Sequence, residues 1–299
     1  MTARIDYDMP IADYLAIDAL SSGAVGDLLE SPSLYYGRHL AAKRGDTAHV
    51  LAHGTSDATE RGSAFHALVL EGDEVYADRI AVWRGGPTEK GVHSTHRGTK
   101  YYKQDWEPAQ REAGRTIIDA DDDAVVQLMR YGVQAHPDAN RLLYELPGVA
   151  EATFLFELRG MPCKARPDRT LFELDTIVEL KTAASTAEKA IERQAAELGY
   201  HRKAEWYRRA YLECTGRPLR EFIFVSVPSL PPYEDVVTWT SIPLAETVAS
   251  LQVDRALDDL VDRLASDDWR PRRCRDIQAV GLPLWAIDDD IRNQLEGFR

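Results

Sequence analysis

Hydrophobic and polar residues alternate most regularly in the middle of the chain. Apolar side chains fall at every second position of residues 151–158, and this period of two predicts a β-strand. Residues 159–162, Arg-Gly-Met-Pro, mark a turn, and residues 163–169 form a second extended piece. Residues 176–182 are rich in β-branched and other apolar residues and predict a third, largely buried strand.

The third strand, at residues 176–182, carries charged side chains within an apolar run. Ile177, Glu179 and Lys181 share one face of this strand, because successive side chains point to opposite faces. The extended piece before it delivers Asp168 beside the strand. A carboxylate and an ammonium group on a core strand are costly unless they serve each other or a ligand. The pattern therefore predicts a polar site that joins the three charged side chains.

Helical patterns occupy much of the remaining chain. Serine, aspartate and proline at expected first turns mark where helices begin, and Gly199 is an expected C-cap. Helices are expected at residues 22–29 with Ser21 or Ser22 as cap, from Pro32, at 61–70, at 119–135 capped by Asp119, from Pro137, from a cap at Ser185 or Thr186 to Leu198, at 200–214 and at 244–264. Two more strands are expected at residues 220–228 and 235–240, whereas 1–20 show no period and 43–58 are expected to form a loop.

The composition is that of a globular protein. The chain has 299 residues, of which 44% are hydrophobic, enough for a large core in one elaborated domain or at most two. No apolar run approaches the ~18 residues that a membrane-spanning helix needs, and the N-terminus lacks a secretory pattern, so a cytoplasmic protein is expected. Cys163, Cys214 and Cys274 lie far apart, which argues against a disulfide framework, a zinc site or an iron–sulfur cluster.

The charge distribution is uneven. A net charge of −13 argues against a protein that coats nucleic acid without specificity. Residues 199–220, however, hold six lysines and arginines against two glutamates, a local net charge of +4. The acids gather elsewhere, at residues 119–123, 254–268 and 288–290. This segregation leaves room for a local basic groove that binds DNA.

Residues 61–70 contain a histidine in an otherwise apolar helical pattern. Gly62 lies one helical turn before His66, so it is expected to leave space beside the imidazole. Two interpretations stay open: a hydrogen-bonded core histidine, or a metal ligand if other ligands lie near it.

Residues 84–115 are rich in glycine, cations and aromatic rings. This mixture is typical of a mobile loop that follows a phosphate backbone and offers rings for base stacking. A solvated loop with a short helix explains it equally well.

Taken together, these motifs resemble the PD-(D/E)xK nucleases, and within them the RecE or exonuclease VIII-like group of phage and prophage recombination exonucleases. The resemblance covers roughly residues 20–240 and rests on four pieces: Gly62 to His66, Pro167-Asp168, Glu179-Leu180-Lys181, and the helix from Tyr200 to Tyr207. It implies an α/β (α+β) core of the restriction-endonuclease type, with a mixed central sheet flanked by helices. The nuclease core would then occupy residues 61–240, including the basic loop at 84–115, between an N-terminal helical lead-in at 1–60 packed on the core and a C-terminal helix and tail at 241–299.

The resemblance also implies roles for the site residues. His66, Asp168 and Glu179 are expected to ligate a divalent metal, together with the backbone carbonyl of Leu180, and Lys181 to orient or activate the attacking water. Independently, a set of oxygen ligands with one imidazole suits Mg²⁺ or Mn²⁺ better than structural zinc.

One further acid and one departure from the family pattern affect this site. Glu151, at the start of the first strand, is a candidate for an extra ligand, although an exposed acid at a strand end explains it more simply. Lys203 stands where the family usually has glutamine, and a lysine can hold a phosphate only as a point charge. The residues expected to contact DNA are Lys203, Tyr207, Tyr200 and Arg166.

The resemblance implies a metal-dependent exonuclease that degrades linear duplex DNA from its ends, 5′ to 3′, and leaves a 3′ single strand for recombination. Its implied partners are double-stranded DNA ends and a RecT-like single-strand annealing protein, and a homo-oligomer is an open alternative. A nuclease of the same fold that acts on single strands or internally also stays open. So does a DNA-end-binding protein that has lost turnover.

Overall fold

The structure is a computed structural model that describes residues 2–271 except residues 53 and 55. Its central sheet has the strand order β12–β11–β10–β9–β6. Strands β10 and β11 are parallel, and the other neighbours are antiparallel, so the sheet is mixed as expected. The bounds are β6 Val149–Ala150, β9 Arg169–Leu171, β10 Thr176–Ala183, β11 Glu221–Pro228 and β12 Val237–Trp239.

A second sheet is formed by β1, β7 and β8, with bounds Arg4–Asp6, Thr153–Leu158 and Met161–Ala165. One hairpin joins the two sheets, because β6 leads into β7 and β8 leads into β9. Its two arms cross between the sheets at Glu151 and at Asp168, where the amide of Glu151 donates to the carbonyl of Asp168 at 3.1 Å. The expectation of one continuous extended piece at 163–169 is therefore wrong: the strand breaks at residues 166–168.

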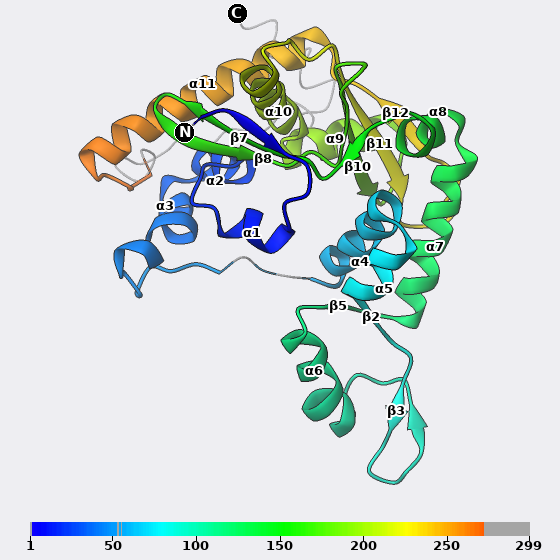
Figure 1. Ribbon diagram of the computed structural model, residues 1–299. Coiled ribbons are helices and arrows are strands. Elements are labelled where there is room, and N and C mark those ends of the chain that lie inside the picture. The colour runs from blue at the N-terminus through cyan, green and yellow to red at the C-terminus, as the bar shows by residue number, and fades with distance from the viewer. Residues whose placement is uncertain (1, 53, 55, 272–299) are drawn as a thin grey trace, which may run out of the picture.

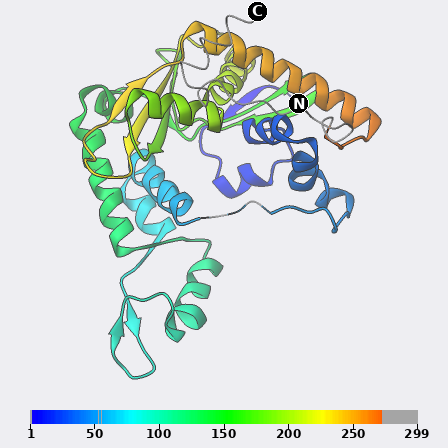
Figure 2. The ribbon, with the colours of Figure 1, turned by 180° about the vertical axis from the view of Figure 1, so that it is seen from behind.

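Helices cover both faces of the central sheet (Figures 1 and 2). Helices α2 Ser22–Glu30, α10 Tyr200–Thr215 and α11 Pro243–Ser266 share one core with Ile177 and Phe224. Helices α4 Asp57–His66 and α7 Ala120–Ala135 share the other core with Val178 and Leu180. The predicted alternation of faces along β10 is thus confirmed, because neighbouring apolar residues enter opposite cores.

Several predicted helix ends are confirmed. Ser21 caps α2 by accepting from the amide of Ala24, Asp119 caps α7 by accepting from the amide of Asp122, and Gly199 ends α9 in the left-handed conformation with φ of 67°. The predicted cap at Ser185 or Thr186 is wrong, because α9 begins after Ala187, which makes no side-chain cap. The smaller helices are α1 Ile11–Ala16, α3 Pro32–Tyr35, α5 Asp73–Arg79, α8 Pro137–Asn140 and α9 Glu188–Leu198, with single turns η1 Tyr36–Leu40, η2 Ala42–Arg44, η3 Ala67–Glu71 and η5 Arg141–Glu145.

Residues 84–115 form an insertion that projects from the body at the bottom of Figure 1. It is framed by the parallel pair β2 Ile80–Trp83 and β5 Thr116–Asp119, and it contains the hairpin β3 Gly86–Pro87 and β4 His93–Ser94, the turn η4 Tyr102–Trp106 and helix α6 Glu107–Glu112. Trp83, Tyr102 and Trp106 pack against one another, with centroids 4.9 to 5.6 Å apart. Tyr102 is buried in the insertion's own core and is not available for stacking, whereas Tyr101 is 37% exposed. The contact of this segment with DNA stays a prediction.

The N-terminal segment also differs from the expectation. Residues 1–20 contain β1, which pairs with β7, and α1, so they are more regular than their sequence indicates. None of the helices in the described part is both long and apolar enough to cross a membrane. Cys163 and Cys214 are free thiols. The part of the expected C-terminal tail beyond residue 271, which includes Cys274, lies outside the described residues.

Candidate active site

The site lies where the hairpin crosses between the sheets. The buried carboxylates of Asp168 and Glu179 are held by reciprocal backbone contacts: the Asp168 amide donates to Glu179 Oε1 at 3.1 Å, and the Leu180 amide donates to Asp168 Oδ2 at 2.7 Å. Strand β10 places Glu179 and Lys181 on one face, and the break before β9 turns Asp168 toward them. The structure therefore brings these three side chains together.

Two lysines converge on the fully buried Glu179. Lys181 Nζ lies 2.5 Å from Glu179 Oε2, and Lys203 Nζ, from α10, lies 2.7 Å from the same oxygen. Lys181 Nζ also donates to the Leu180 carbonyl at 3.2 Å and lies 3.8 Å from Asp168 Oδ2. Glu179 and the Leu180 carbonyl, which the resemblance implies as metal ligands, therefore face ammonium groups in this structure.

His66 and Glu151 complete a second cluster around Asp168. His66 Nδ1 lies 3.6 Å from Asp168 Oδ1, and ligand atoms of His66, Glu151 and Asp168 all lie within 4.8 Å of one another. His66 is the last residue of α4, directly before the π-helical turn η3, a feature that often occurs at functional sites. Its side chain is 29% exposed, so it is not a core histidine. A Cβ at Gly62 would meet nothing within 4 Å, so the glycine is not needed to make room for the imidazole.

Glu151 is not the exposed strand-end acid that its sequence position suggests. It adopts the left-handed conformation, with φ of 55°, at the point where the hairpin leaves the central sheet. Such a conformation is uncommon outside glycine and often marks a functional site. Its carboxylate pairs with Arg166 Nε at 2.7 Å.

The pKa values of the site carboxylates are pushed apart. Burial, and then the charge of Asp168, raises the pKa of Glu151 to about 7, against the opposing effect of Arg166. Burial alone would raise the pKa of Asp168, but His66, Lys181 and Lys203 outweigh it and hold that pKa below its usual range. Burial would lower the pKa of Lys203, and the charge of Glu179 instead holds it well above the ordinary value.

The cluster of His66, Glu151 and Asp168 fits a divalent metal ion. Their ligand atoms all lie within 4.8 Å of one another, close enough for one ion to contact all three. Burial, and then the charge of Asp168, raises the pKa of Glu151, and a cation near the two carboxylates would oppose the second of these effects. Two carboxylates and one imidazole form a donor set suited to Mg²⁺ or Mn²⁺.

The residues expected to contact DNA occupy different positions. Tyr207 is 5% exposed and its hydroxyl donates to the Arg166 carbonyl at 3.0 Å. Arg166 is likewise turned inward, with bonds to Glu151, to Thr153 Oγ1 and to the Met9 carbonyl. Both side chains therefore support the site from within. Tyr200, in contrast, lines the cleft beside Lys181.

A cleft of about 790 Å³ opens onto His66, Glu151 and Lys181. The cleft is also lined by Gln194, on the predicted helix that ends at Leu198, and by helix α1, and the sequence indicated neither at the site. Gln194 of α9 donates to the Thr182 carbonyl and to the Tyr200 hydroxyl, at 2.9 and 3.0 Å. Helix α1 lies along the cleft with its apolar residues exposed, and it is tied down by Lys164. Neither Gln194 nor α1 belongs to a residue spacing that would have predicted its place at the site.

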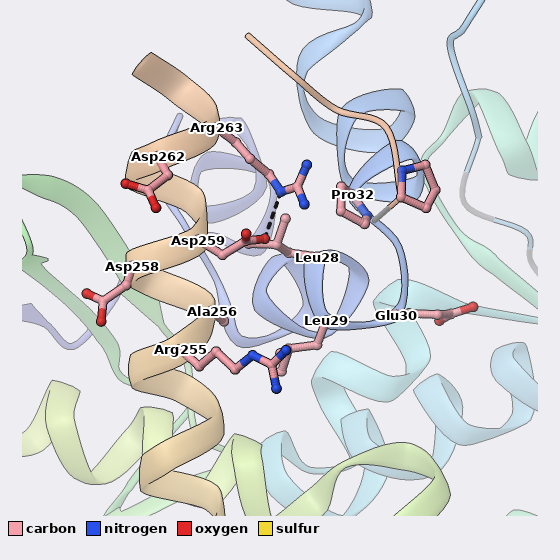
Figure 3. A pocket seen from close by; sticks show the side chains of 11 residues that line it. Leu28, Leu29, Glu30, Pro32, Arg255, Ala256, Asp258, Asp259, Asp262 and Arg263 are labelled. Carbon is pink, nitrogen blue, oxygen red and sulfur yellow. Dashed lines mark hydrogen bonds and ion pairs between the residues drawn. The ribbon is translucent and has the colours of Figure 1, made fainter. Parts of the chain in front are cut away.

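A separate pocket of about 580 Å³ lies between α2 and α11 (Figure 3). Four carboxylates and two arginines line it, among them Asp258, Asp259 and Asp262 of α11, with Arg263 Nε bound to Asp259 Oδ2 at 2.7 Å. The carboxylates outnumber the arginines and would repel phosphate, so this pocket is not suited to a nucleic-acid backbone.

Comparisons with known proteins agree on the fold. A family model described as a PDDEXK-like domain of unknown function (DUF3799) matches residues 36–282. A crystal structure of a protein from Eubacterium rectale, provisionally named an exonuclease, is similar to this chain with a TM-score of 0.60 at 12% identity, and the match covers 94% of this chain and 98% of that one. The structure of SSO0001 gives a TM-score of 0.29 at 13% identity over 67% of this chain and 84% of that one, too low to support any conclusion. No curated protein sequence matches the chain.

Proposed function

The chain belongs to the DUF3799 family of PDDEXK-like domains, and on this premise we propose that it is a metal-dependent nuclease that hydrolyses phosphodiester bonds of DNA. The observation that carries the proposal is the convergence of His66, Glu151 and Asp168 at one cleft, with Lys181 beside them. The three ligands would hold the metal ion, and the lysine would orient the water that attacks the phosphodiester bond.

A divalent ion, when bound, neutralises charge on the phosphoryl group and makes its bound water more acidic. His66 and Asp168 are the proposed ligands that both the resemblance and the geometry favour, and Glu151 is the ligand that the geometry adds. The resemblance implies two further metal ligands, Glu179 and the Leu180 carbonyl. The Leu180 carbonyl would need Lys181 to move before it could take part, and Glu179 would need both Lys181 and Lys203 to move.

Lys181 is the proposed residue for handling the attacking water. Its Nζ donates to Glu179 Oε2 and to the Leu180 carbonyl, and it lies 3.8 Å from Asp168 Oδ2. Its ammonium group can orient a water or a phosphate oxygen by hydrogen bonding. Tyr200 lies beside it, with Lys181 Nζ 5.6 Å from its ring centroid, and shields the site on that side.

The proposed substrate is the end of linear duplex DNA, degraded 5′ to 3′ to leave a 3′ single strand. The name of the Eubacterium rectale neighbour supports the exonuclease part of this proposal. The direction, a RecT-like annealing partner and a ring-like oligomer rest on the resemblance to the RecE-like group.

One observation favours a second candidate. Lys203 neutralises Glu179, a carboxylate that the resemblance implies as a metal ligand, and this suits a DNA-end-binding protein without turnover. Cleavage distinguishes the two candidates directly.

The test is digestion of linear and of closed circular duplex with Mg²⁺, with Mn²⁺ or with a chelator. We expect loss of linear DNA only, and only with metal. Asp168→Ala and Lys181→Ala should each abolish cleavage, and only Asp168→Ala should also greatly weaken metal binding. Lys189→Ala, an exposed lysine on α9, is the matched control and should retain the wild-type rate. Attack on closed circles would instead indicate an endonuclease, and intact linear DNA with either metal would refute the nuclease proposal.

A further inference from the structure

Both oxygens of Glu179 are already engaged by groups of the protein. Oε1 accepts from the Asp168 amide at 3.1 Å, and Oε2 lies 2.5 Å from Lys181 Nζ and 2.7 Å from Lys203 Nζ. Glu179 itself is fully buried. Lys203 comes from α10 and is held in place by the ring of Tyr207, whose centroid lies 5.3 Å from Nζ. The second ammonium group therefore lies directly on the carboxylate of Glu179.

Cationic side chains already face the carboxylates of the site. The carboxylates are Glu151, Asp168 and Glu179, and the cations are Arg166, Lys181 and Lys203. A first divalent ion adds two positive charges to the site, and a second adds two more. Because Glu179 is fully buried, the repulsion between a second ion at Glu179 and the two ammonium groups beside it is screened poorly.

The two carboxylate clusters differ in what they offer a cation. His66, Glu151 and Asp168 place three ligand atoms within 4.8 Å of one another on the cleft. Glu179 offers a second ion only a carboxylate that already carries two ammonium groups. Ions in two-metal sites lie about 3.5–4 Å apart, so a second ion at Glu179 would stand next to Lys203.

We infer that Lys203 acts as a built-in counter-ion that restricts this site to one divalent ion, held by His66, Glu151 and Asp168, and keeps a second ion away from Glu179. This inference rests on the proposed metal-dependent function. It assigns Lys203 a role in choosing the number of ions rather than in gripping DNA, and it gives a physical reason for the lysine where the family has glutamine.

The test is the number of ions bound, measured without DNA by calorimetric titration with Mg²⁺ and by the electron paramagnetic resonance of Mn²⁺. Wild type should bind one ion, and Lys203→Gln should bind two. Lys203→Arg keeps the charge and should bind one. Arg202→Gln removes a neighbouring charge that bonds to Gln252 Oε1 instead of the site carboxylates, so it should also bind one. Glu179→Gln combined with Lys203→Gln should return the number to one.

Two outcomes overturn the inference: two ions bound by wild type, or one ion still bound by a folded Lys203→Gln protein. Circular dichroism checks the fold of each variant, and Lys203→Met replaces Lys203→Gln if the latter does not fold. If Lys203→Gln binds a second ion and Lys203→Met does not, the inference is also overturned. The new amide would then be the cause of the second ion, and not the loss of the positive charge. Wild type that binds no ion overturns both the inference and the proposed metal dependence. Wild type that binds one ion and cleaves no DNA overturns the nuclease proposal alone.

Discussion

Replacing Glu179 by glutamine should destabilise the metal-free protein strongly, although the two side chains have almost the same shape. The new amide side chain can still accept the Asp168 amide bond through its oxygen, a bond 3.1 Å long in the wild type. It cannot supply the negative charge that pairs with Lys181 at 2.5 Å and with Lys203 at 2.7 Å. Two ammonium groups would then lie close together without the carboxylate that joins them.

The size of the effect follows from burial. Removing one partner of a buried ion pair costs about 3–5 kcal/mol, because the remaining charge is left uncompensated. Lys181 is 12% exposed and Lys203 29% exposed, so water moderates the penalty at Lys203. We therefore expect a loss near the lower end of that range, about 3 kcal/mol. Lys203→Gln alone should cost less, about 1–2 kcal/mol, because Glu179 keeps its bond to Lys181.

The assay is urea unfolding in the presence of a chelator, followed by tryptophan fluorescence and by circular dichroism. Coincident curves from the two signals check that one unfolding free energy describes the transition. The double variant, with glutamine at both positions, should be more stable than the sum of the two losses indicates, by about 1–3 kcal/mol. An unfolding free energy of Glu179→Gln equal to that of wild type, or strictly additive losses, would show that the two lysines do not depend on this carboxylate.

Two further predictions concern Glu151 and Gly132. The pKa of Glu151 is raised to about 7 from an ordinary value of 4.5, so the stability that its protonated form contributes is present below pH 4.5 and is lost as the pH rises through 7. The shift corresponds to about 3 kcal/mol, so Glu151→Gln should stabilise the metal-free protein at pH 8 and flatten its melting temperature between pH 4.5 and 7; an unchanged pH profile would contradict this. Gly132→Ala should cost about 1–3 kcal/mol in thermal unfolding, because its Cβ would lie 2.1 Å from the Tyr233 carbonyl oxygen, whereas Gly62→Ala, with nothing within 4 Å, is the control; equal melting temperatures of the two variants would show that the Tyr233 backbone moves freely.

The local pattern of the chain predicted much of the sheet and its flanking helices. Alternation along residues 176–182 identified β10 and the two faces of the strand, and capping residues located the starts of α2 and α7. These features depend on neighbouring residues, whose spacing is written directly in the sequence. The same reasoning did not reveal that Tyr102 and Trp106 of the insertion at 84–115 pack against Trp83, whereas Tyr101 is exposed.

The sequence by itself determined which residues of β10 face the site, since a strand alternates its side chains whatever surrounds it. Only the tertiary structure decided which side chains from other elements contact them. Glu151 joins His66 and Asp168 because the hairpin turns between two sheets at a left-handed residue, and no sequence period marks that turn. Lys203 reaches Glu179 because α10 packs on the central sheet, so the partner of the buried carboxylate comes from a distant element. Contacts of this kind depend on how the elements pack. The pKa shifts of Glu151, Asp168 and Lys203 follow from the distances between these charges, which only the tertiary structure gives.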